Sequence, residues 1–206
     1  YRNIPIQYQG SENFYEQSMV KQVIAHLRVA IDPYDLTAIA DLAPTLYINR
    51  DTAYEHATMT LNENVKGLHA LNELAIGYKS TELAKRAALI ETIGKLSPKS
   101  AIQKIRKGFF EKFIQSVADN SLYQDMQNDI LDELETSAQR FKTIEEFIEF
   151  VDAFISQCSN LEQAEDAVKL MTIHQSKGLE FKTVFVIGVC ERILPHHSAI
   201  STNDKP

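Results

Sequence analysis

The 206-residue chain contains no tryptophan, two cysteines, six prolines and seven glycines. Cys158 and Cys190 lack the C-x-x-C spacing of zinc ligands and redox pairs, so we expect a reducing, cytoplasmic location and no bound metal. No apolar run approaches the ~18 residues that span a bilayer, and no signal peptide is evident, which argues against a membrane protein. The G-x-x-x-x-G-K-[ST] loop that cradles nucleotide phosphates is also missing, so the chain alone is not expected to hydrolyse ATP.

The chain starts at Tyr1 without an initiator methionine, so we expect it to be a segment of a longer protein. Its hydrophobic content of 44% and charged content of 24% are ordinary for a globular protein. The length is ample for a hydrophobic core.

Acidic and basic residues are distributed unevenly along a chain whose formal net charge is −7. Residues 79–112 contain nine Lys or Arg against three Glu, whereas residues 119–166 contain thirteen acids against two basic residues. The simpler interpretation is a pair of solvated helical faces of opposite sign. The alternative is a basic face that binds DNA phosphates, for which Lys104, Arg106 and Lys107 are the candidates.

The two ends of the chain are expected to form strands of one parallel sheet. Apolar and polar residues alternate over residues 4–8, which is the period of a half-buried strand, and a helix stopped by Asp32-Pro33 follows. Near the other end, "VKLMTI" and "KTVFVIGV" are typical of two more strands, buried on both faces. Because the first segment cannot complete a sheet alone, we expect these distant segments to pair with each other.

Residues 36–165 show no strand pattern and are typical of successive amphipathic helices. Ser97-Pro98 is an N-cap followed by proline at the first helical position, and Thr143-x-x-Glu146 is a capping box. A further apolar stripe at helical spacing consists of Tyr123, Met126, Ile130 and Leu134. The pattern predicts an α/β fold in which a large all-helical insertion interrupts a partial parallel sheet.

The polar string "TIHQSKGLEF" occupies residues 172–181, between the two expected C-terminal strands. In open parallel sheets the working residues lie in loops beyond the carboxyl ends of strands. Thr172, His174 and Lys177 carry groups that bind phosphate oxygens. Gly178 permits a tight turn with exposed amides, and Glu180 is an acceptor suited to a ribose hydroxyl. Two apolar residues of this loop are expected to be buried and to hold the turn rigid: Leu179 and Phe181.

The pattern T-x-H-x-x-K-G-L-E-F resembles motif V of the UvrD/Rep/PcrA-type superfamily 1 DNA helicases. Two further stretches support the resemblance. "YQGSENFYEQSMVKQVIAHLRVAIDP" at residues 8–33 is similar to a family segment and the long helix after it, and "GVCERILPHHS" at residues 188–198 is similar to the strand and tail after motif V. The similarity covers both ends of the chain in order, whereas the helical middle fits the family by position and class.

The resemblance implies a domain division and a function. Residues 1–35 and 168–206 would be two segments of the second RecA-like motor domain, and residues 36–167 would be its helical insertion subdomain. The parent would be an ATP-dependent DNA helicase or translocase, using ATP and Mg²⁺ to move on single-stranded DNA and unwind duplexes. The isolated segment would be inactive and would hold neither ATP nor Mg²⁺ tightly.

The resemblance also implies residue roles and partners. Gly178 and Glu180 would contact ATP, while Thr172, His174 and Lys177 would contact or shape the site for the single-stranded DNA track. No catalytic residue falls in this segment. The expected partners are DNA, the first RecA-like motor domain of the same parent chain, and repair or replication proteins. A bacterial cytoplasmic location follows, with the protein associated with the nucleoid when on DNA.

The chain departs from the family pattern at Gln9, Gln17, Met19 and Gln22, and over one further stretch. Pro44-Thr-Leu-Tyr-Ile-Asn49 stands where the family commonly has Pro-x-Arg-Gly-Ile-Gly. Tyr47 and Asn49 replace glycines whose amides approach duplex phosphates, so we do not expect the same close backbone approach here.

Two alternatives stay open. The helical insertion would act as a protein-interaction or autoinhibitory module, which the acidic 119–166 segment favours. The parent would instead be a helicase–nuclease subunit, or a translocase that strips proteins from DNA, and a nuclease motif in the parent sequence would decide this.

Overall fold

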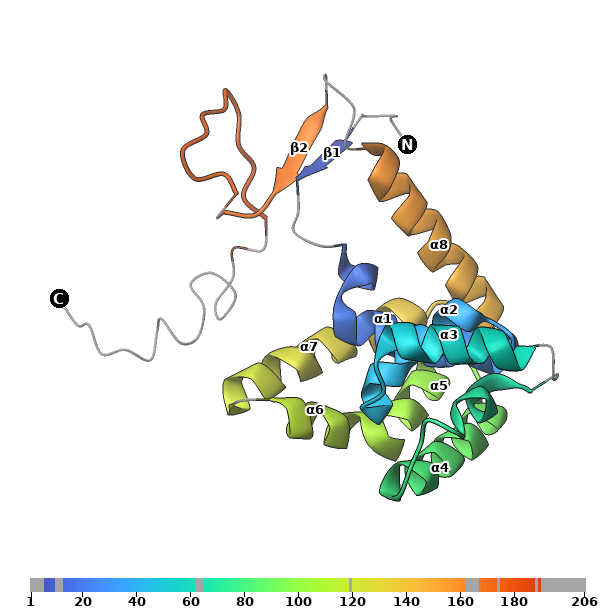
Figure 1. Ribbon diagram of the computed structural model, residues 1–206. Helices are drawn as coiled ribbons and strands as arrows, with labels where there is room; N and C mark the ends of the chain where they lie inside the picture. Colours follow the sequence, from blue (N-terminus) through green and yellow to red (C-terminus); the bar gives the residue numbers. More distant parts are fainter. Residues whose placement is uncertain are drawn as a thin grey trace.

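The structure, a computed structural model, describes residues 6–9, 13–61, 65–118, 120–161, 167–173, 175–187 and 189. Most of these residues are helical, and the helices form a body from which one long helix rises to a small sheet (Figure 1). No helix among the described residues is long and apolar enough to cross a membrane.

The sheet joins the two ends of the chain. Strand β1 (Ile6–Gln9) pairs in parallel with β2 (Val168–Met171), with Ile6 opposite Val168 and Gln9 opposite Met171. The expected pairing of the distant ends is therefore confirmed. Two strands do not establish a RecA-like sheet, which stays a prediction.

The apolar run after the loop differs from expectation. Residues 183–187 are described and form no strand, and the side chains of Phe185 and Ile187 are 86% and 85% exposed. The prediction of a strand there is wrong for these residues. An extended segment becomes a strand only where a neighbouring strand pairs with its amides and carbonyls, and this segment has no such neighbour in the described part of the chain.

Helices and helical turns form most of the described structure, and no strand occurs within residues 65–118 or 120–161, as expected for the middle of the chain. Ser97 caps its helix by accepting the Ser100 N–H, and Thr143 accepts the Glu146 N–H. The elements are η1 (Phe14–Glu16), α1 (Ser18–Ile31), α2 (Leu36–Leu42), η2 (Ala43–Leu46), α3 (Arg50–Thr60), η4 (Gly67–Leu71), α4 (Tyr78–Ile93), α5 (Pro98–Ile105), the π-helical turn η5 (Arg106–Phe110), α6 (Glu111–Val117), α7 (Ser121–Ala138) and α8 (Ile144–Leu161).

Helix α1 lies at the centre of the helical body and contributes to two hydrophobic cores. Val23 and Leu27 pack with α5, η5, α7 and α8 in the first core, and Ala25 and Val29 pack with α2, α3 and α4 in the second. Although its sequence resembles the first motor segment, α1 packs with the helices of the middle of the chain. The domain division at residues 35 and 167 stays a prediction.

Candidate nucleotide and nucleic-acid interface

The loop at residues 172–181 begins at the carboxyl end of β2 and is held by its own hydrogen bonds. Gln175 Oε1 accepts the Thr172 N–H at 3.1 Å and the Thr172 hydroxyl at 3.2 Å, and the Gln175 N–H donates to Thr172 Oγ1 at 3.3 Å. The Ser176 N–H then donates to the Thr172 carbonyl at 3.0 Å. Thr172 is thus oriented by Gln175, a residue to which the sequence interpretation gave no role. The Thr-x-x-Gln spacing, which resembles that of a capping box, was the available signal.

The other predicted loop residues lie on the surface. Gly178 has a φ of 82°, in the region that favours glycine, and a Cβ added there would have no neighbour within 4 Å. Lys177 and Glu180 are both exposed, and neither has an ion-pair partner among the described residues. The loop therefore presents one cation, one acid and a conformationally permissive glycine to solvent. His174 lies outside the described residues.

The two apolar residues of the loop are not buried. Leu179 is 50% exposed and Phe181 is 40% exposed, so the expectation that they lie beneath the turn is wrong for this chain. Burial of a loop residue needs a surface to pack against, and the described sheet has only the two strands β1 and β2.

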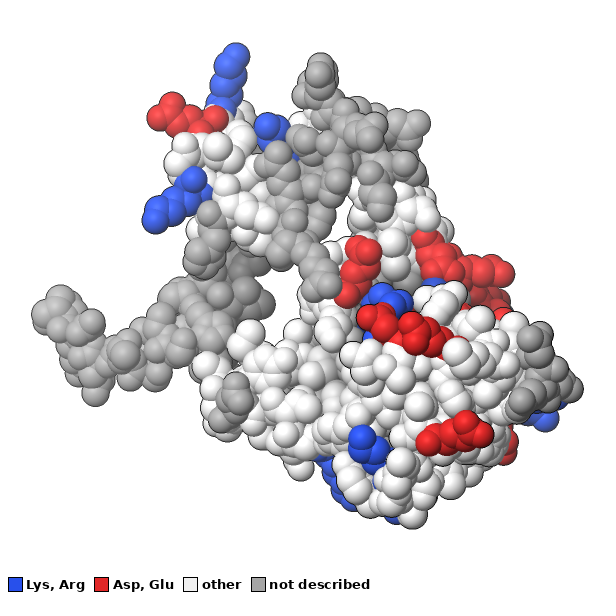
Figure 2. Space-filling model, in the orientation of Figure 1, with Lys and Arg blue, Asp and Glu red and all other residues white. Residues whose placement is uncertain are grey.

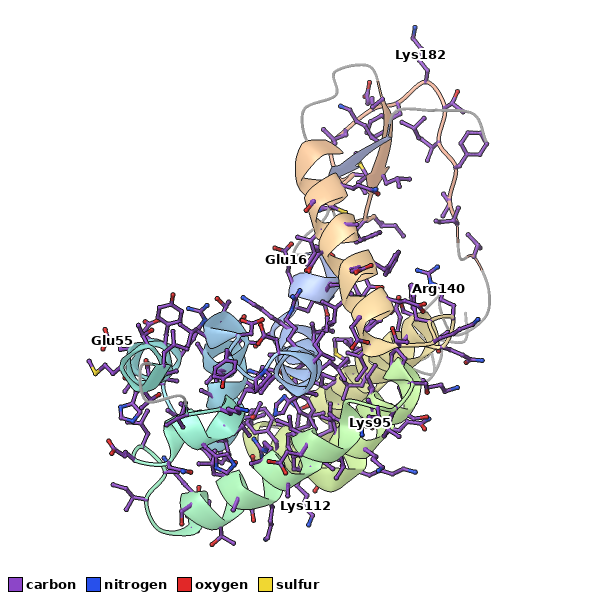
Figure 3. The ribbon with its side chains drawn as sticks, turned by 90° about the vertical axis from the view of Figure 1, so that its right-hand side faces the viewer. Glu16, Glu55, Lys95, Lys112, Arg140 and Lys182 are labelled. Carbon is purple, nitrogen blue, oxygen red and sulfur yellow. The ribbon has the colours of Figure 1, made fainter. Side chains whose placement is uncertain are left out.

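The basic stretch at residues 79–112 lies apart from the loop. Lys182, one residue beyond the loop, and Lys112, at the end of the stretch, lie at opposite ends of the molecule (Figure 3). Within the stretch, Lys104 and Lys107 are exposed and point their charges to solvent. The structure therefore does not bring these candidates together with Thr172 or Lys177.

Arg106, the third candidate of the stretch, is occupied by acids of α7. Its Nη1 lies 2.6 Å from Asp132 Oδ1 and 2.5 Å from Glu135 Oε1, and its side chain is 11% exposed. Burial alone would lower the pKa of Arg106, but the bonds from the two carboxylates outweigh this effect and raise it. The guanidinium links η5 to α7, so Lys104 and Lys107 are better placed than Arg106 to meet a phosphate.

Arg86 is also withdrawn from the surface. Its guanidinium lies 3.6 Å from the centroid of the Phe109 ring, and Nη1 donates to Thr45 Oγ1. Burial lowers the pKa of Arg86 to about 10. The basic stretch is therefore not one continuous charged face, because the guanidinium of Arg86 packs in the protein interior.

The segment that departs from the family pattern keeps a glycine-like backbone. Tyr47 has a φ of 57° and a ψ of 33°, its hydroxyl bonds Ser116 Oγ at 2.6 Å, and its carbonyl accepts Lys79 Nζ at 3.0 Å. Asn49 Oδ1 accepts the N–H groups of Asp51 and Thr52 at the start of α3. The side chains of Tyr47 and Asn49 are therefore both engaged within the fold, and the expectation that this stretch lacks the close backbone approach of glycine amides stays a prediction.

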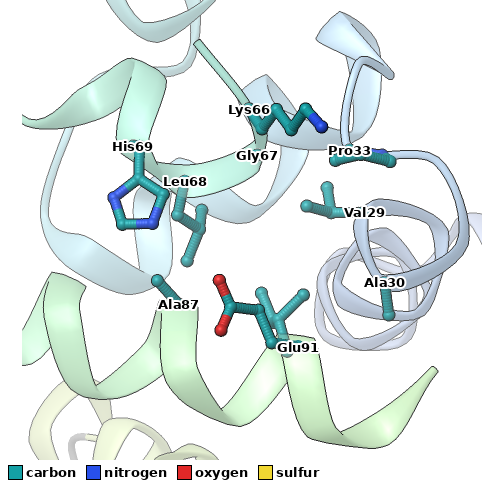
Figure 4. A pocket seen from close by; sticks show the side chains of 10 residues that line it. Val29, Ala30, Pro33, Lys66, Gly67, Leu68, His69, Ala87 and Glu91 are labelled. Atoms are coloured by element: carbon teal, nitrogen blue, oxygen red, sulfur yellow. The ribbon is translucent and has the colours of Figure 1, made fainter. Parts of the chain in front are cut away.

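A pocket of about 200 Å³ lies between α1, η4 and α4 (Figure 4). Val29, Ala87 and Ile90 give it apolar walls, while Lys66, His69 and Glu91 supply its charged and polar groups. None of the predicted nucleotide-binding residues lines it, and Glu91 would repel phosphate oxygens. The pocket is therefore not a candidate nucleotide site.

Comparison with known proteins identifies the class. A family model, the UvrD-like helicase C-terminal domain, matches residues 1–205, and the chain belongs to this family.

Three relatives illustrate the similarity. The chain is 28% identical over 200 residues to the "Putative ATP-dependent DNA helicase YjcD" of Bacillus subtilis (strain 168), covering 95% of this chain and 26% of the relative. It is 25% identical to the ATP-dependent DNA helicase PcrA of Staphylococcus epidermidis (98% of this chain, 30% of the relative). It is 26% identical to the ATP-dependent DNA helicase Rep of Buchnera aphidicola (98% and 35%). The chain thus spans about a quarter to a third of the length of these curated relatives.

Proposed function

We propose that the chain is the part of an ATP-dependent DNA helicase in which the loop at residues 172–181 couples the nucleotide to the DNA track. The observation that carries the proposal is the parallel pairing of β1 with β2, since it places the loop at the carboxyl end of a strand. The family match over residues 1–205 supports the same assignment. Glu180 would accept a bond from the ribose, and Gly178 would let the backbone approach the nucleotide.

The DNA side of the loop consists of Thr172, His174 and Lys177. Gln175 holds the Thr172 hydroxyl in place, and Lys177 is free of ion pairs in the described part of the chain. Because one short segment touches both ligands, closure around ATP would shift the grip on the strand. The remainder of the helicase would supply the phosphate-binding loop and hold Mg²⁺, and the protein would act in the bacterial cytoplasm.

The exposed run at residues 183–187 fits the same proposal. Val184 and Val186 are 64% and 58% exposed, which is unusual within a contiguous apolar run. Residues 168–206 would form the second motor segment, and other parts of the complete protein would cover this run. Leu179 and Phe181, which are half-exposed, would be covered in the same way.

The test uses the full-length protein that carries this chain. Losing a hydrogen bond to a charged group costs roughly 1.5–3 kcal/mol, so Glu180→Ala is expected to slow ATP-driven unwinding by about ten- to hundredfold. His174→Ala should reduce DNA-stimulated ATPase more than basal ATPase. Because both changes break one closure step, their effects on unwinding should be non-additive. Lys182→Ala, just outside the loop, is the matched control.

Two results would contradict the proposal. A double variant whose defect equals the sum of the single defects would mean that Glu180 and His174 act independently. ATP turnover by the isolated 206-residue chain, abolished by a substitution within it, would overturn the assignment altogether.

A second DNA contact is proposed at Lys104 and Lys107. Reversing both charges in the full-length protein should weaken duplex binding and reduce the slope of log K against log salt by about 2, one unit per lost phosphate contact. Arg106 is left unchanged because its reversal would also break the link to α7. Unchanged binding at low salt would leave the two lysines as solvated surface charges.

A further inference from the structure

Helix α7 carries an apolar row that the described structure leaves uncovered. Leu122 and Met126 are 55% and 54% exposed, and Tyr123 beside them is 39% exposed. Residues four apart lie on one side of a helix, so Leu122 and Met126 form a row that continues into Ile130. Ile130 is partly buried against the core, so the uncovered part of the row consists of Leu122 and Met126. The side of α7 that faces the core is a different one, formed by Gln127, Leu131, Leu134 and Ala138.

An acidic row runs beside the apolar row. Asp125, Asp129 and Glu133 are exposed and also four residues apart, which places them on a line about 60° around the helix from Leu122 and Met126. None of these acids has an ion-pair partner among the described residues, whereas other acids of α7 bind Arg106. Like charges at this spacing disfavour the helix slightly. The acidic row therefore contributes no stabilising ion pair to the described fold.

The surroundings leave this surface accessible. Helices α6 and α7 form a pair that projects from one side of the helical body, away from α3 and α4 (Figure 1). One face over α6 and α7 is largely uncharged, and acidic side chains gather over α8 (Figure 2). An exposed apolar row beside an uncompensated acidic row matches one class of ligand by both hydrophobic contact and charge.

We propose that α7 is a docking site for a basic amphipathic helix of a partner protein. Apolar side chains of the partner would cover Leu122, Tyr123 and Met126. Lysines or arginines on its neighbouring face would pair with the acidic row. Residues 122–133 rise about 17 Å along the axis, which corresponds to about three turns of a partner helix. This interaction requires neither ATP nor DNA, so its failure would leave the proposed helicase function untouched.

The test measures binding of the 206-residue chain to a fluorescein-labelled model helix of leucine and lysine by fluorescence anisotropy. Two variants probe the two rows separately: Leu122→Ser with Met126→Ser, and Asp125→Asn with Asp129→Asn and Glu133→Gln. The matched control removes three exposed acids elsewhere on the surface, namely Glu55, Glu145 and Glu149, each replaced by Gln. The control therefore has the same net charge as the acidic-row variant.

The wild-type chain should bind the model helix, and each row variant should lose about tenfold or more in affinity, because both anchors and charges contribute. The control should stay within about twofold of the wild type. Hydrogen exchange should show that the helix protects amides of α7 and not those of α3. This second measurement uses only the wild-type chain and does not depend on how the variants fold.

Several results would overturn the proposal. These are absence of wild-type binding, an equal loss in the control, undiminished binding by the apolar-row variant, or protection outside α7. A wild-type dimer in sedimentation velocity that the apolar-row variant loses would also overturn it, because a second copy of the chain would then be the occupant.

Discussion

Replacing His26 with glutamine is expected to remove a defined part of the acid sensitivity of the fold. His26 lies on α1, is fully buried, and its ring centroid is 4.9 Å from that of Phe109. Its Nδ1 lies 2.7 Å from the Gln22 carbonyl, so the neutral ring donates its proton there. Nε2 has no hydrogen-bond partner among the described residues. A second proton on Nε2 would have no acceptor.

The pKa of His26 determines the sign and size of the effect. Burial, and after it the positive charge of Arg86, lower the pKa from 6.5 to about 3. Between these values the unfolded chain binds more protons than the folded chain, so stability falls as the pH falls through this window. With these pKa values, the free energy of unfolding contributed by His26 drops by about 2 kcal/mol between pH 7 and pH 5.

The measurement is urea unfolding of the wild type and of His26→Gln at pH 7 and pH 5, followed by circular dichroism. Between pH 7 and pH 5 the free energy of unfolding of the wild type should fall by about 2 kcal/mol more than that of the variant. This difference does not depend on how far the substitution itself lowers stability at pH 7. His69→Gln is the matched control, because His69 is exposed and its replacement leaves the core intact. A His26→Gln chain that loses stability as steeply as the wild type would refute the reasoning.

Substitutions at three further positions test the packing, each by unfolding measurements on the isolated chain. Arg106→Gln should lower the free energy of unfolding by about 1–3 kcal/mol, because two carboxylates of α7 lose their partner, and the exposed Lys104→Gln should not. At Tyr47, glycine should be more stable than alanine by about 1 kcal/mol, since only glycine readily adopts a φ of 57°. Equal midpoints would contradict this. Gly94→Ala would place a Cβ 2.8 Å from the Ala30 carbonyl oxygen and should lower the thermal midpoint; an unchanged midpoint would show that the helices separate freely.

The features that could be predicted from the sequence are those that depend on neighbouring residues or on chain topology. Ser97 and Thr143 cap helices because their hydroxyls reach amides three residues away. Asp32 ends α1 because the following proline disfavours further helix. The pairing of β1 with β2 followed from the need of a single strand for a partner.

Other features depend on which elements meet in space, and these could not be predicted from the pattern alone. The stripe on α7 is an example, since Leu134 is buried while Tyr123 and Met126 are exposed. Periodicity identifies an apolar face, but it does not say whether another helix covers all of it. The burial of Arg86 and Arg106 could not be predicted for the same reason. Only the fold places Phe109 against Arg86 and the acids of α7 against Arg106.

The connection between the sheet and the helical body explains why the end segments and the middle are structurally linked. Helix α8 contacts both β1 and η1, and the Tyr15 ring of η1 packs edge-on against Phe147, Phe150 and Phe154 along α8. The Tyr15 hydroxyl also bonds Ser137 of α7. Helix α8 and the turn η1, which lie between the sheet and the helical body, therefore pack side by side and share one aromatic cluster. Under the proposed function, movement of the loop after β2 would be transmitted to the helices through this cluster, because α8 is held to η1 by rings that cannot slide past one another without repacking.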